Sequence, residues 1–343
     1  MRSSDTVPVI DINPFRVGAR PGAPGAAEDR QAVIDQVRQA LETIGFFVIT
    51  GHGLAPDLQA RTLHVAREFF DLPEDEKLRY CQVPHSFMGY NPVGAERVAY
   101  AHHDESAPDL KANFTMGRVD IDERDPYYSC ETGRRMFQPN IWPVRPTRFQ
   151  SVLTEYAVAG EQLTLTLTEI FALALDLPQD YFADKLDKSL YFLRVLDYPP
   201  LTTPLRPKQF RIGPHSDYGT LTLVTADGPG LQVKTRAGEW KDVPYVADGI
   251  QVNIGDMMEQ WTNDRWVSTQ HRVLVPDDPA TRRQHRQAIA FFLIANYDTE
   301  IAPFETMVDQ THPARYAPVN AGQDLVAKLV RQYTREDQEE QQA

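Results

Sequence analysis

The sequence predicts a mainly β protein with flanking helices, whose core is an antiparallel sandwich or barrel. From about residue 190 onwards, short runs rich in β-branched and aromatic residues follow one another at fairly even spacing. Turn residues such as Asp-Gly-Pro-Gly at 227–230 separate these runs, and helical patterns do not alternate with them. A parallel sheet built from βαβ repeats is therefore not expected. The predicted helices lie mainly in the part of the chain before residue 190.

Length and composition indicate one globular unit. The chain has 343 residues, of which 42% are hydrophobic and 24% charged, as in ordinary folded proteins. This is long for one domain, but β-barrel proteins with a helical surround often reach this size. We expect residues 1–145 to form an α/β cap that does not fold independently. Residues 146–343 then hold a long helix, the β core and a C-terminal helix.

Periodicity predicts the elements of the first part in order. Strands are expected at 6–12 and 46–50, a Pro/Gly/Ala-rich loop at 18–29, and amphipathic helices at 30–44 and 55–70. Residues 82–145 have weak periodicity and many Pro, Gly, Tyr and His residues. We expect loops with short strands there, bordering a site. The strongest helical stretch is 146–177.

The second part contains the predicted β core. Strands are expected at 191–198, 220–225, 230–234, 243–246, 251–254, 266–275 and 287–294, followed by a helix near 321–333.

Charge and cysteine content exclude several classes of partner. The formal net charge is −13, which repels a phosphate backbone and argues against nucleic-acid binding. The sequence contains neither an apolar run long enough to cross a bilayer nor a signal stretch, so we expect a soluble cytoplasmic protein without a membrane partner.

Cys81 and Cys130 are isolated and favour structural thiols over a zinc knuckle or a disulfide framework.

The segment GPHSDYG at 213–219 holds the most informative residues. His215 and Asp217 are two positions apart, so on a strand they would point to the same face. His271 begins a later β-rich run and can supply a third ligand. Two histidines and one carboxylate are typical of non-haem iron(II) oxygenases, because they leave metal positions open. On these residues alone, ordinary surface or hydrogen-bonded histidines remain an alternative.

A basic residue at the start of an apolar strand supports the interpretation of these three residues as an iron site. Arg286 opens the run RQAIAFFLI at 286–294 and must face either water or an anion. A diacid bound to iron through its 2-oxo acid end needs a forked cation for its far carboxylate, and Arg provides one. Arg282 and Arg283 lie in the preceding turn, where we expect them to be solvated.

Over nearly its whole length the chain resembles the iron(II)/2-oxoglutarate-dependent dioxygenases, in the branch similar to isopenicillin N synthase. The motifs that carry the resemblance occur in one order: VPVID at 7–11, GFF…HG at 45–53, HSDYGTLTL at 215–223, NIGD at 253–256 and HRV at 271–273.

The resemblance implies a double-stranded β-helix core of the jelly-roll, cupin-like type. It implies that His215, Asp217 and His271 ligate Fe(II), and that Arg286 and Tyr198 hold the far carboxylate of the co-substrate 2-oxoglutarate. The strand period puts Arg194 on the same face as Tyr198, so Arg194 can also reach this pocket, although a surface salt bridge is an equal alternative. The implied reaction uses O₂ and most commonly hydroxylates a C–H bond of a small molecule, with release of succinate and CO₂.

Two departures from the family pattern leave alternatives open. The usual Arg-x-Ser is Arg286-Gln-Ala288 here, as in bacterial ethylene-forming enzyme, and the Asn of an Asn-x-Tyr pair is Leu196. Both departures concern 2-oxoglutarate and leave the iron site intact, so an oxidase or cyclase that does not use 2-oxoglutarate and an ethylene-forming type remain alternatives. A metal-free barrel that binds a small molecule or acts as a scaffold is a separate alternative. The substrate is expected to be a natural product or amino-acid derivative, selected by loops at 87–98 and 101–116. The oligomeric state is not predicted.

Overall fold

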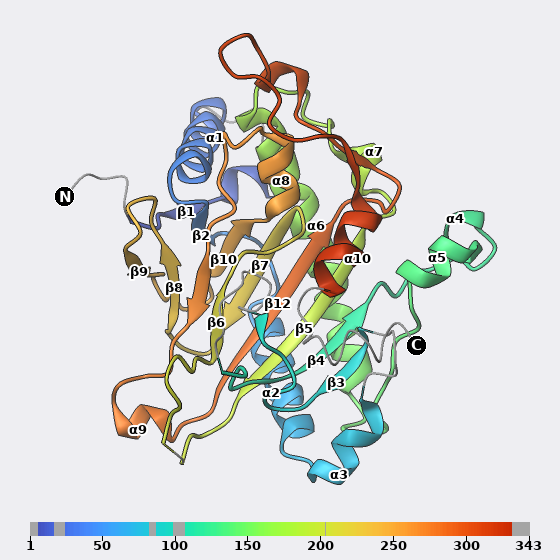
Figure 1. Ribbon diagram of the computed structural model, residues 1–343, viewed down its shortest axis with the longest axis vertical. Helices are drawn as coiled ribbons and strands as arrows, with labels where there is room; N and C mark the ends of the chain where they lie inside the picture. The colour runs from blue at the N-terminus through green and yellow to red at the C-terminus, as the bar shows by residue number, and fades with distance from the viewer. Residues whose placement is uncertain (1–5, 17–24, 82–86, 99–106, 203, 331–343) are drawn as a thin grey trace.

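The computed structural model describes residues 6–16, 25–81, 87–98, 107–202 and 204–330 (Figure 1). Within these ranges an eight-stranded sheet has the order β1-β2-β10-β7-β12-β5-β4-β3, a four-stranded sheet has the order β6-β11-β8-β9, and β13 pairs with β14. β1 and β2 are parallel, and the other pairs are antiparallel.

The strands of the large sheet come from both parts of the chain. They are β1 (Val9–Asp11), β2 (Phe46–Thr50), β3 (Gly89–Asn91), β4 (Ala112–Gly117), β5 (Leu190–Tyr198), β7 (Leu221–Ala226), β10 (Ile250–Ile254) and β12 (Arg286–Ile294). The remaining strands are β6 (Ile212–His215), β8 (Leu231–Lys234), β9 (Trp240–Asp242), β11 (His271–Val273), β13 (Glu300–Ile301) and β14 (Val319–Asn320). The division of the chain at residue 145 stays a prediction.

Three long helices, α1 (Ala26–Thr43), α2 (Leu58–Phe70) and α6 (Phe149–Ala174), lie behind the large sheet in Figure 1. The shorter α-helices are α3 (Glu74–Lys77), α4 (Pro126–Ser129), α5 (Glu131–Met136), α7 (Ala183–Leu186), α8 (Asp256–Trp261), α9 (Pro279–Arg282) and α10 (Ala321–Val330). Single 3₁₀ turns are η2 (Asn13–Phe15), η3 (Leu78–Tyr80) and η5 (Glu305–Met307).

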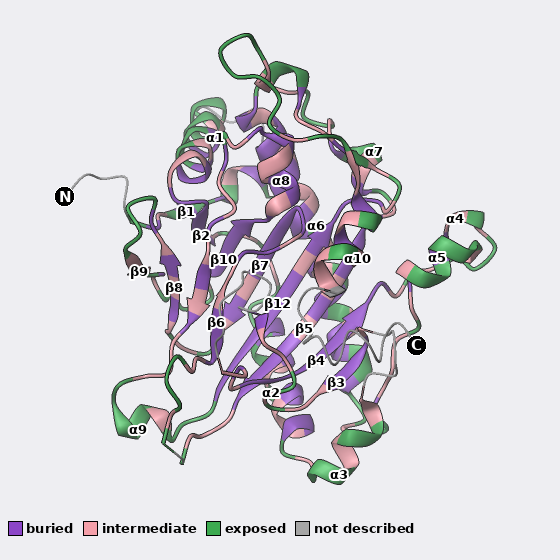
Figure 2. Cartoon of the chain, in the orientation of Figure 1, coloured by how far each residue is buried: buried purple, intermediate pink, exposed green. Residues whose placement is uncertain are grey.

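The central strand β12 has two buried faces that belong to different cores (Figure 2). Ile289, Phe291 and Leu293 pack in the large hydrophobic cluster shared with the helices. Ala288 and Ala290 alternate with them and belong to a second cluster, which contains residues of both sheets. The two sheets therefore face each other across this second cluster, which is a jelly-roll arrangement, and the predicted fold class is confirmed.

Close packing of α6 on β12 depends on a glycine. A Cβ atom added at Gly160 would lie 2.9 Å from Cδ2 of Phe291, so a larger residue would push the helix away from the sheet.

Most predicted elements are confirmed, with small shifts of their ends, but one predicted strand is wrong and another is much shorter than expected. Residues 243–246 are not a strand, because Pro244 lacks an N–H for the ladder, and β9 ends just before them. The predicted strand at 266–275 shrinks to β11. Its first part bonds elsewhere, because the Ser268 N–H donates to Glu259 and the Thr269 hydroxyl donates to the Ile44 carbonyl.

Other differences concern elements that the sequence pattern did not indicate. β6 and α8 were not predicted, and α1 starts at Ala26, inside the predicted loop at 18–29. Residues 17–24 and 99–106 lie outside the described ranges, so what the sequence predicts for them stays a prediction.

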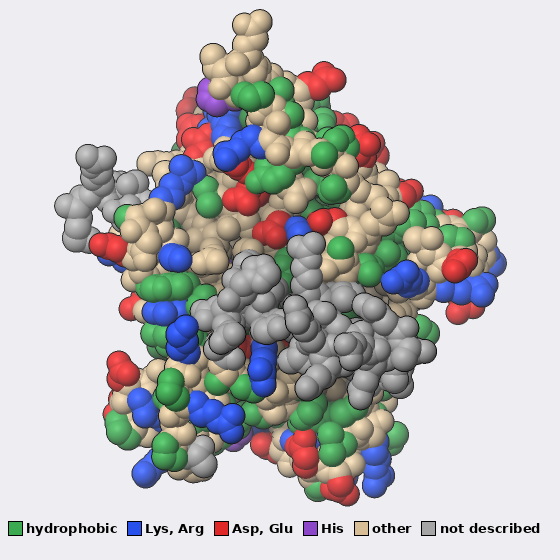
Figure 3. Space-filling model, in the orientation of Figure 1, with side chains coloured by type: hydrophobic (Ala, Val, Ile, Leu, Met, Phe, Trp, Pro, Cys, Tyr) green, Lys and Arg blue, Asp and Glu red, His purple; other side chains and the backbone are tan. Residues whose placement is uncertain are grey.

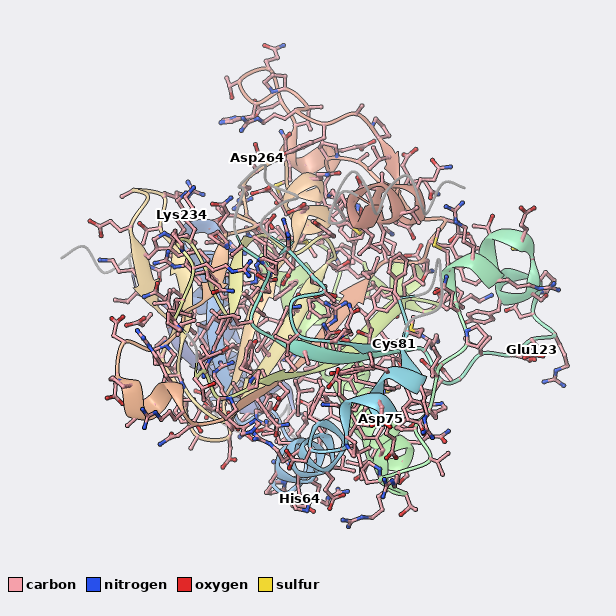
Figure 4. All side chains as sticks on the ribbon, turned by 60° about the horizontal axis from the view of Figure 1, so that its bottom comes forward. His64, Asp75, Cys81, Glu123, Lys234 and Asp264 are labelled. Atoms are coloured by element: carbon pink, nitrogen blue, oxygen red, sulfur yellow. The ribbon has the colours of Figure 1, made fainter. Side chains whose placement is uncertain are left out.

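Surface features are unexceptional in the described part of the chain. Acidic and basic side chains are mixed across the face seen in Figure 3. Cys130 is exposed, and Cys81, labelled in Figure 4, is partly exposed; both are free thiols. No helix within the described ranges has both the length and the apolarity needed to span a membrane.

Candidate active site

His215 and His271 are brought together by strand pairing in the small sheet. His215 is the last residue of β6 and His271 the first residue of β11, and the two are direct cross-strand partners. Their ring centres are 4.2 Å apart. Asp217 lies two residues beyond β6, so the expectation that it shares a strand face with His215 is wrong. A turn positions it instead, and the Asp256 N–H donates to its carbonyl at 2.8 Å.

The three side chains nevertheless converge. One possible ligand atom from each of His215, Asp217 and His271 lies within 4.8 Å of the others. Oδ1 of Asp217 is 3.9 Å from Nε2 of His215 and 3.7 Å from Nε2 of His271. Asp217 and His271 are buried, while His215 is partly exposed.

Backbone carbonyls determine which ring nitrogen of each histidine carries the proton. Nδ1 of His215 lies 2.9 Å from the carbonyl of Gly213, and Nδ1 of His271 lies 3.1 Å from that of Thr269. Because a carbonyl oxygen can only accept, Nδ1 is the protonated nitrogen in both neutral rings. The Nε2 lone pairs therefore face Oδ1 of Asp217, as a metal ligand set requires.

The other carboxylate oxygen of Asp217 is fully occupied. The Thr222 hydroxyl donates to Oδ2 at 2.6 Å, and the Asn253 amide donates to it at 2.7 Å. Burial raises the pKa of Asp217, but the positive charges that His271 and His215 carry when protonated, together with these hydrogen bonds, outweigh burial and hold the pKa below its usual value. The site thus presents two imidazole nitrogens and one anionic oxygen, a donor set that suits Fe(II).

Two cavities meet at this triad. The outer cavity, with about 700 Å³ of empty space, is lined by Phe87, Val98, Thr115, Phe192, Arg194, His215, Ser216, Asp217, Tyr218, Gly219, Phe292, Ile294, Leu325 and Leu329. The inner cavity, with about 610 Å³, lies between the two sheets. It is lined by Val98, Lys111, Arg194, Leu196, Tyr198, Ile212, His215, Asp217, Thr222, Val224, Leu231, Gln251, His271, Val273, Arg286, Ala288, Ala290 and Phe292.

Arg286 and Tyr198 are neighbours on the wall of the inner cavity. Arg286 is 5% exposed, and its Nε donates to the Pro229 carbonyl at 2.9 Å. Its Nη1 is buried and has no hydrogen-bond partner in the described part of the chain. Burial raises the pKa of Tyr198, although the nearby positive charges of Arg286 and Arg211 oppose that effect, so its hydroxyl stays protonated at neutral pH.

Arg194 lies on the same face of β5 as Leu196 and Tyr198, as predicted, and all three line the inner cavity. Unlike the other two, it also lines the outer cavity. Its Nε donates to the Thr115 hydroxyl at 3.1 Å, and its Nη1 is 3.4 Å from Oε2 of Glu96. The alternative prediction was that Arg194 forms a salt bridge at the surface. The pair that it forms with Glu96 is partly buried, so this alternative does not describe it.

Several polar residues of the site were not identified from the sequence. Glu96 also pairs with buried Lys111, and the charges of Arg194 and Lys111 outweigh its burial and lower its pKa. Arg211 is buried beside Tyr198, with its guanidinium carbon 5.6 Å from the ring centre. The one local signal for Arg211 is a charged residue four positions before His215, at the entry to β6.

Comparisons with protein families agree with this geometry. Residues 7–145 match the family described as the N-terminal region of non-haem dioxygenases in morphine synthesis. Residues 189–295 match the 2OG-Fe(II) oxygenase superfamily and contain the whole triad together with Arg286 and Tyr198.

Characterised relatives match over most of their length. A homoarginine-6-hydroxylase from Oryza sativa subsp. japonica is 31% identical, over 94% of this chain and 96% of the relative. A validamycin A dioxygenase from Streptomyces hygroscopicus subsp. limoneus is 29% identical, over 96% of this chain and 87% of the relative.

Solved structures share the fold. A full-length Neurospora crassa protein in complex with alpha-KG superposes with a TM-score of 0.82 at 26% identity, covering 97% of this chain and 98% of that one. The same protein with alpha-KG and thymine gives 0.81 at 25% identity, covering 97% and 99%. The predicted family is confirmed: the chain belongs to the 2OG-Fe(II) oxygenase superfamily and is an Fe(II)- and 2-oxoglutarate-dependent oxidoreductase.

Proposed function

We propose that this enzyme hydroxylates a C–H bond of a small molecule, with Fe(II) held by His215, Asp217 and His271. The observation that carries the proposal is the convergence of two imidazole Nε2 atoms and one carboxylate oxygen where the two cavities meet. Three protein ligands on one side leave the opposite side of a metal ion for small ligands, as oxygen chemistry requires. When bound, Fe(II) and 2-oxoglutarate supply the activation of O₂, with succinate and CO₂ as co-products.

The inner cavity is the proposed site of 2-oxoglutarate. Its lining includes the triad, which can receive the 2-oxo acid end, and also Arg286 and Tyr198 for the far carboxylate. The Pro229 carbonyl engages Nε of Arg286, which fixes the plane of the guanidinium and leaves Nη1 for a ligand. The protonated Tyr198 hydroxyl can donate a second bond.

The outer cavity is the proposed site of the organic substrate. Its lining is largely apolar, with Phe87, Phe192 and Phe292 among its members, and Arg194 stands at its junction with the inner cavity. Such a lining fits a small natural product or amino-acid derivative with an apolar body and one acidic or hydrogen-bond-accepting group. Residues 87–98 therefore contribute to substrate choice, through Phe87 and Val98.

The protein's part is to orient and to exclude water. Thr222 and Asn253 hold Asp217 so that one oxygen faces the two imidazoles. Leu325 and Leu329 of α10 line the outer cavity with apolar side chains, which disfavours water around the reacting carbon.

The test is iron content and succinate formation in purified protein loaded with Fe(II) without air. We expect His271→Ala to lose both bound iron and succinate release. His64→Ala is the matched control, because His64 projects from the outer side of α2 and pairs with Glu68 (Figure 4). Unchanged iron and turnover in His271→Ala would show that the triad is not the metal site.

The same assay separates the remaining alternatives. Substrate loss and O₂ uptake without added 2-oxoglutarate would favour the oxidase or cyclase reading. Ethylene release from 2-oxoglutarate would favour the ethylene-forming type. Candidate amino-acid derivatives and small natural products are best screened by 2-oxoglutarate-dependent loss of substrate.

A further inference from the structure

Arg211 is a buried cation whose nitrogens are largely unused. It directly precedes β6, and its backbone N–H donates to the Val273 carbonyl at 3.1 Å, which anchors it to β11. The residue is 2% exposed, and neither Nε nor Nη2 has a hydrogen-bond partner in the described ranges. Buried guanidinium N–H groups without hydrogen bonds are unfavourable, so an anion that binds there would stabilise this arrangement.

The guanidinium groups of Arg211 and Arg286 both lie close to the ring of Tyr198. The guanidinium carbons lie 5.6 Å and 4.9 Å, respectively, from the centre of the tyrosine ring. Both arginines have buried N–H groups without a partner within the described part of the chain. Burial lowers the pKa of Arg211, and the charge of Arg286 lowers it further, as expected for two like charges that lie near each other.

The neighbouring carboxylates are engaged elsewhere. Asp197 lies 3.4 Å from Nδ1 of His285, and Asp227 accepts the Gln287 N–H at 2.8 Å. Asp109 accepts the backbone N–H groups of Gly213 and Val98 at 3.0 and 3.3 Å. None of these three carboxylates is hydrogen-bonded to Nε or Nη2 of Arg211.

Position 288 of β12, next to Arg286 on the cavity wall, carries no hydroxyl that could assist a bound carboxylate. Ala288 occupies the next inward-facing position of β12, lines the inner cavity and has no hydrogen-bonding side chain. A ligand carboxylate has room for about four hydrogen bonds, which is more than Arg286 Nη1 and the Tyr198 hydroxyl provide. Arg211 is not among the residues that line the inner cavity, but its guanidinium lies beside the Tyr198 ring and has unused donors.

We propose that Arg211 is a second anion-binding arginine of the co-substrate site, which binds the far carboxylate of 2-oxoglutarate together with Arg286 and Tyr198. In this role Arg211 takes the place of a hydroxyl at position 288. The inference rests on the proposed function, because it assigns the inner cavity to 2-oxoglutarate.

The experiment measures 2-oxoglutarate affinity by calorimetry on Fe(II)-loaded protein without air, with bound iron determined on the same samples. Arg211→Met should weaken binding about tenfold or more, the loss typical of a charge-assisted bond, without loss of iron. Arg211→Met combined with Ala288→Ser should regain part of the affinity, which a purely structural role of Arg211 does not predict. Arg272→Met is the matched control, because Arg272 of β11 donates to Gln232 and stacks on Trp240.

The outcomes separate the inference from the function on which it rests. If wild-type protein binds 2-oxoglutarate and Arg211→Met binds it equally well, the inference is wrong and the proposed function stands. If wild-type protein does not bind 2-oxoglutarate, the proposed function itself fails. Should Arg211→Met not hold iron, Arg211→Lys decides, because it keeps the charge but loses the forked geometry. Weaker 2-oxoglutarate binding by Arg211→Lys then supports the inference, and unchanged affinity overturns it.

Discussion

Arg286 and Tyr198 are direct cross-strand partners in the pairing of β12 with β5, and the guanidinium carbon of Arg286 lies 4.9 Å from the centre of the tyrosine ring. Strand register therefore places a fixed cation and a neutral hydroxyl side by side on one wall of the inner cavity. Because the nine residue pairs of these two strands are continuous, the spacing of the two groups does not depend on a loop.

This pairing predicts that Tyr198→Phe weakens 2-oxoglutarate binding while the fold is kept. The ring and its packing remain, and one hydrogen bond to the ligand is lost, so KM for 2-oxoglutarate should rise about three- to tenfold. Steady-state kinetics with varied 2-oxoglutarate measure this, and KM for the organic substrate serves as the internal control. An unchanged KM for 2-oxoglutarate would remove Tyr198 from the co-substrate site.

Asp217 depends on two neighbours for its orientation, and this gives a second prediction. Thr222→Val removes the 2.6 Å bond to Oδ2 and should lower Fe(II) affinity about tenfold, the usual effect of losing such a partner of a metal ligand. Thr225→Val is the control, because Thr225 lies on the same strand but bonds to Tyr156. Iron titration without air measures both. Equal affinities in the two variants would contradict the proposed role of Thr222.

Arg194 gives a prediction that separates the two ligands of the site. Arg194→Gln should raise KM for the organic substrate about tenfold and change KM for 2-oxoglutarate little, because Arg194 pairs across the strands with Ala290 and not with Arg286. A larger effect on 2-oxoglutarate would support the sequence-based expectation that Arg194 binds the co-substrate. Lys234→Gln is a suitable control, because Lys234 bonds to Gln270 and does not line either cavity.

The proposed metal ligands can be predicted from sequence because they lie in short motifs, whereas their supporting residues cannot. His215 and Asp217 are two positions apart, yet the shared strand face expected for them is wrong, since Asp217 is held by a turn beyond β6. Glu96 and Arg194 are 98 positions apart, and no local pattern connects them. Glu96 lies in the loop after β3, so its contact with Arg194 of β5 depends on the path of that loop in three dimensions, which one sequence does not specify.

Strand ends were harder to predict than strand positions for a similar reason. The apolar run at 243–246 has strand-like residues, but Pro244 interrupts its hydrogen bonding. The residues before β11 donate their hydrogen bonds to Glu259 and Ile44 instead of to a neighbouring strand. In both cases the available hydrogen bonds determined where the strand begins or ends, and the residue types alone did not.

Gly255 supports the turn that holds Asp217, and this predicts a substitution with effects on both stability and metal binding. A Cβ atom at position 255 would lie 2.4 Å from the Gly219 carbonyl and 2.8 Å from that of Asp217. Gly255→Ala should therefore cost about 1–3 kcal/mol of unfolding free energy and reduce bound iron. In Gly228→Ala the added atom meets nothing within 4 Å, so urea unfolding and iron content should stay close to wild type. Similar results for the two variants would show that this contact does not constrain Asp217.

Glu259 of α8 makes the stability of the enzyme depend on pH. Burial is the main cause that raises its pKa to about 7, from 4.5. Asp256 and Asp264 raise the pKa further, whereas the Ser268 N–H and Lys328 lower it. The folded state therefore binds the proton more tightly than the unfolded state, so this contribution to stability is complete below about pH 4.5 and is lost as pH rises through about 7.

Glu259→Gln should remove this loss, because the amide cannot ionise and its oxygen can still accept the Ser268 N–H. Between about pH 5 and pH 8 the variant should gain about 1–2 kcal/mol relative to wild type, after allowance for solvent screening of a partly exposed group. Urea unfolding at both pH values measures the difference. Glu155→Gln is the control, because Arg61 lowers the pKa of Glu155 and its carboxylate is ionised throughout this range. If wild type and Glu259→Gln respond to pH in parallel, Glu259 does not take up the proton near neutral pH.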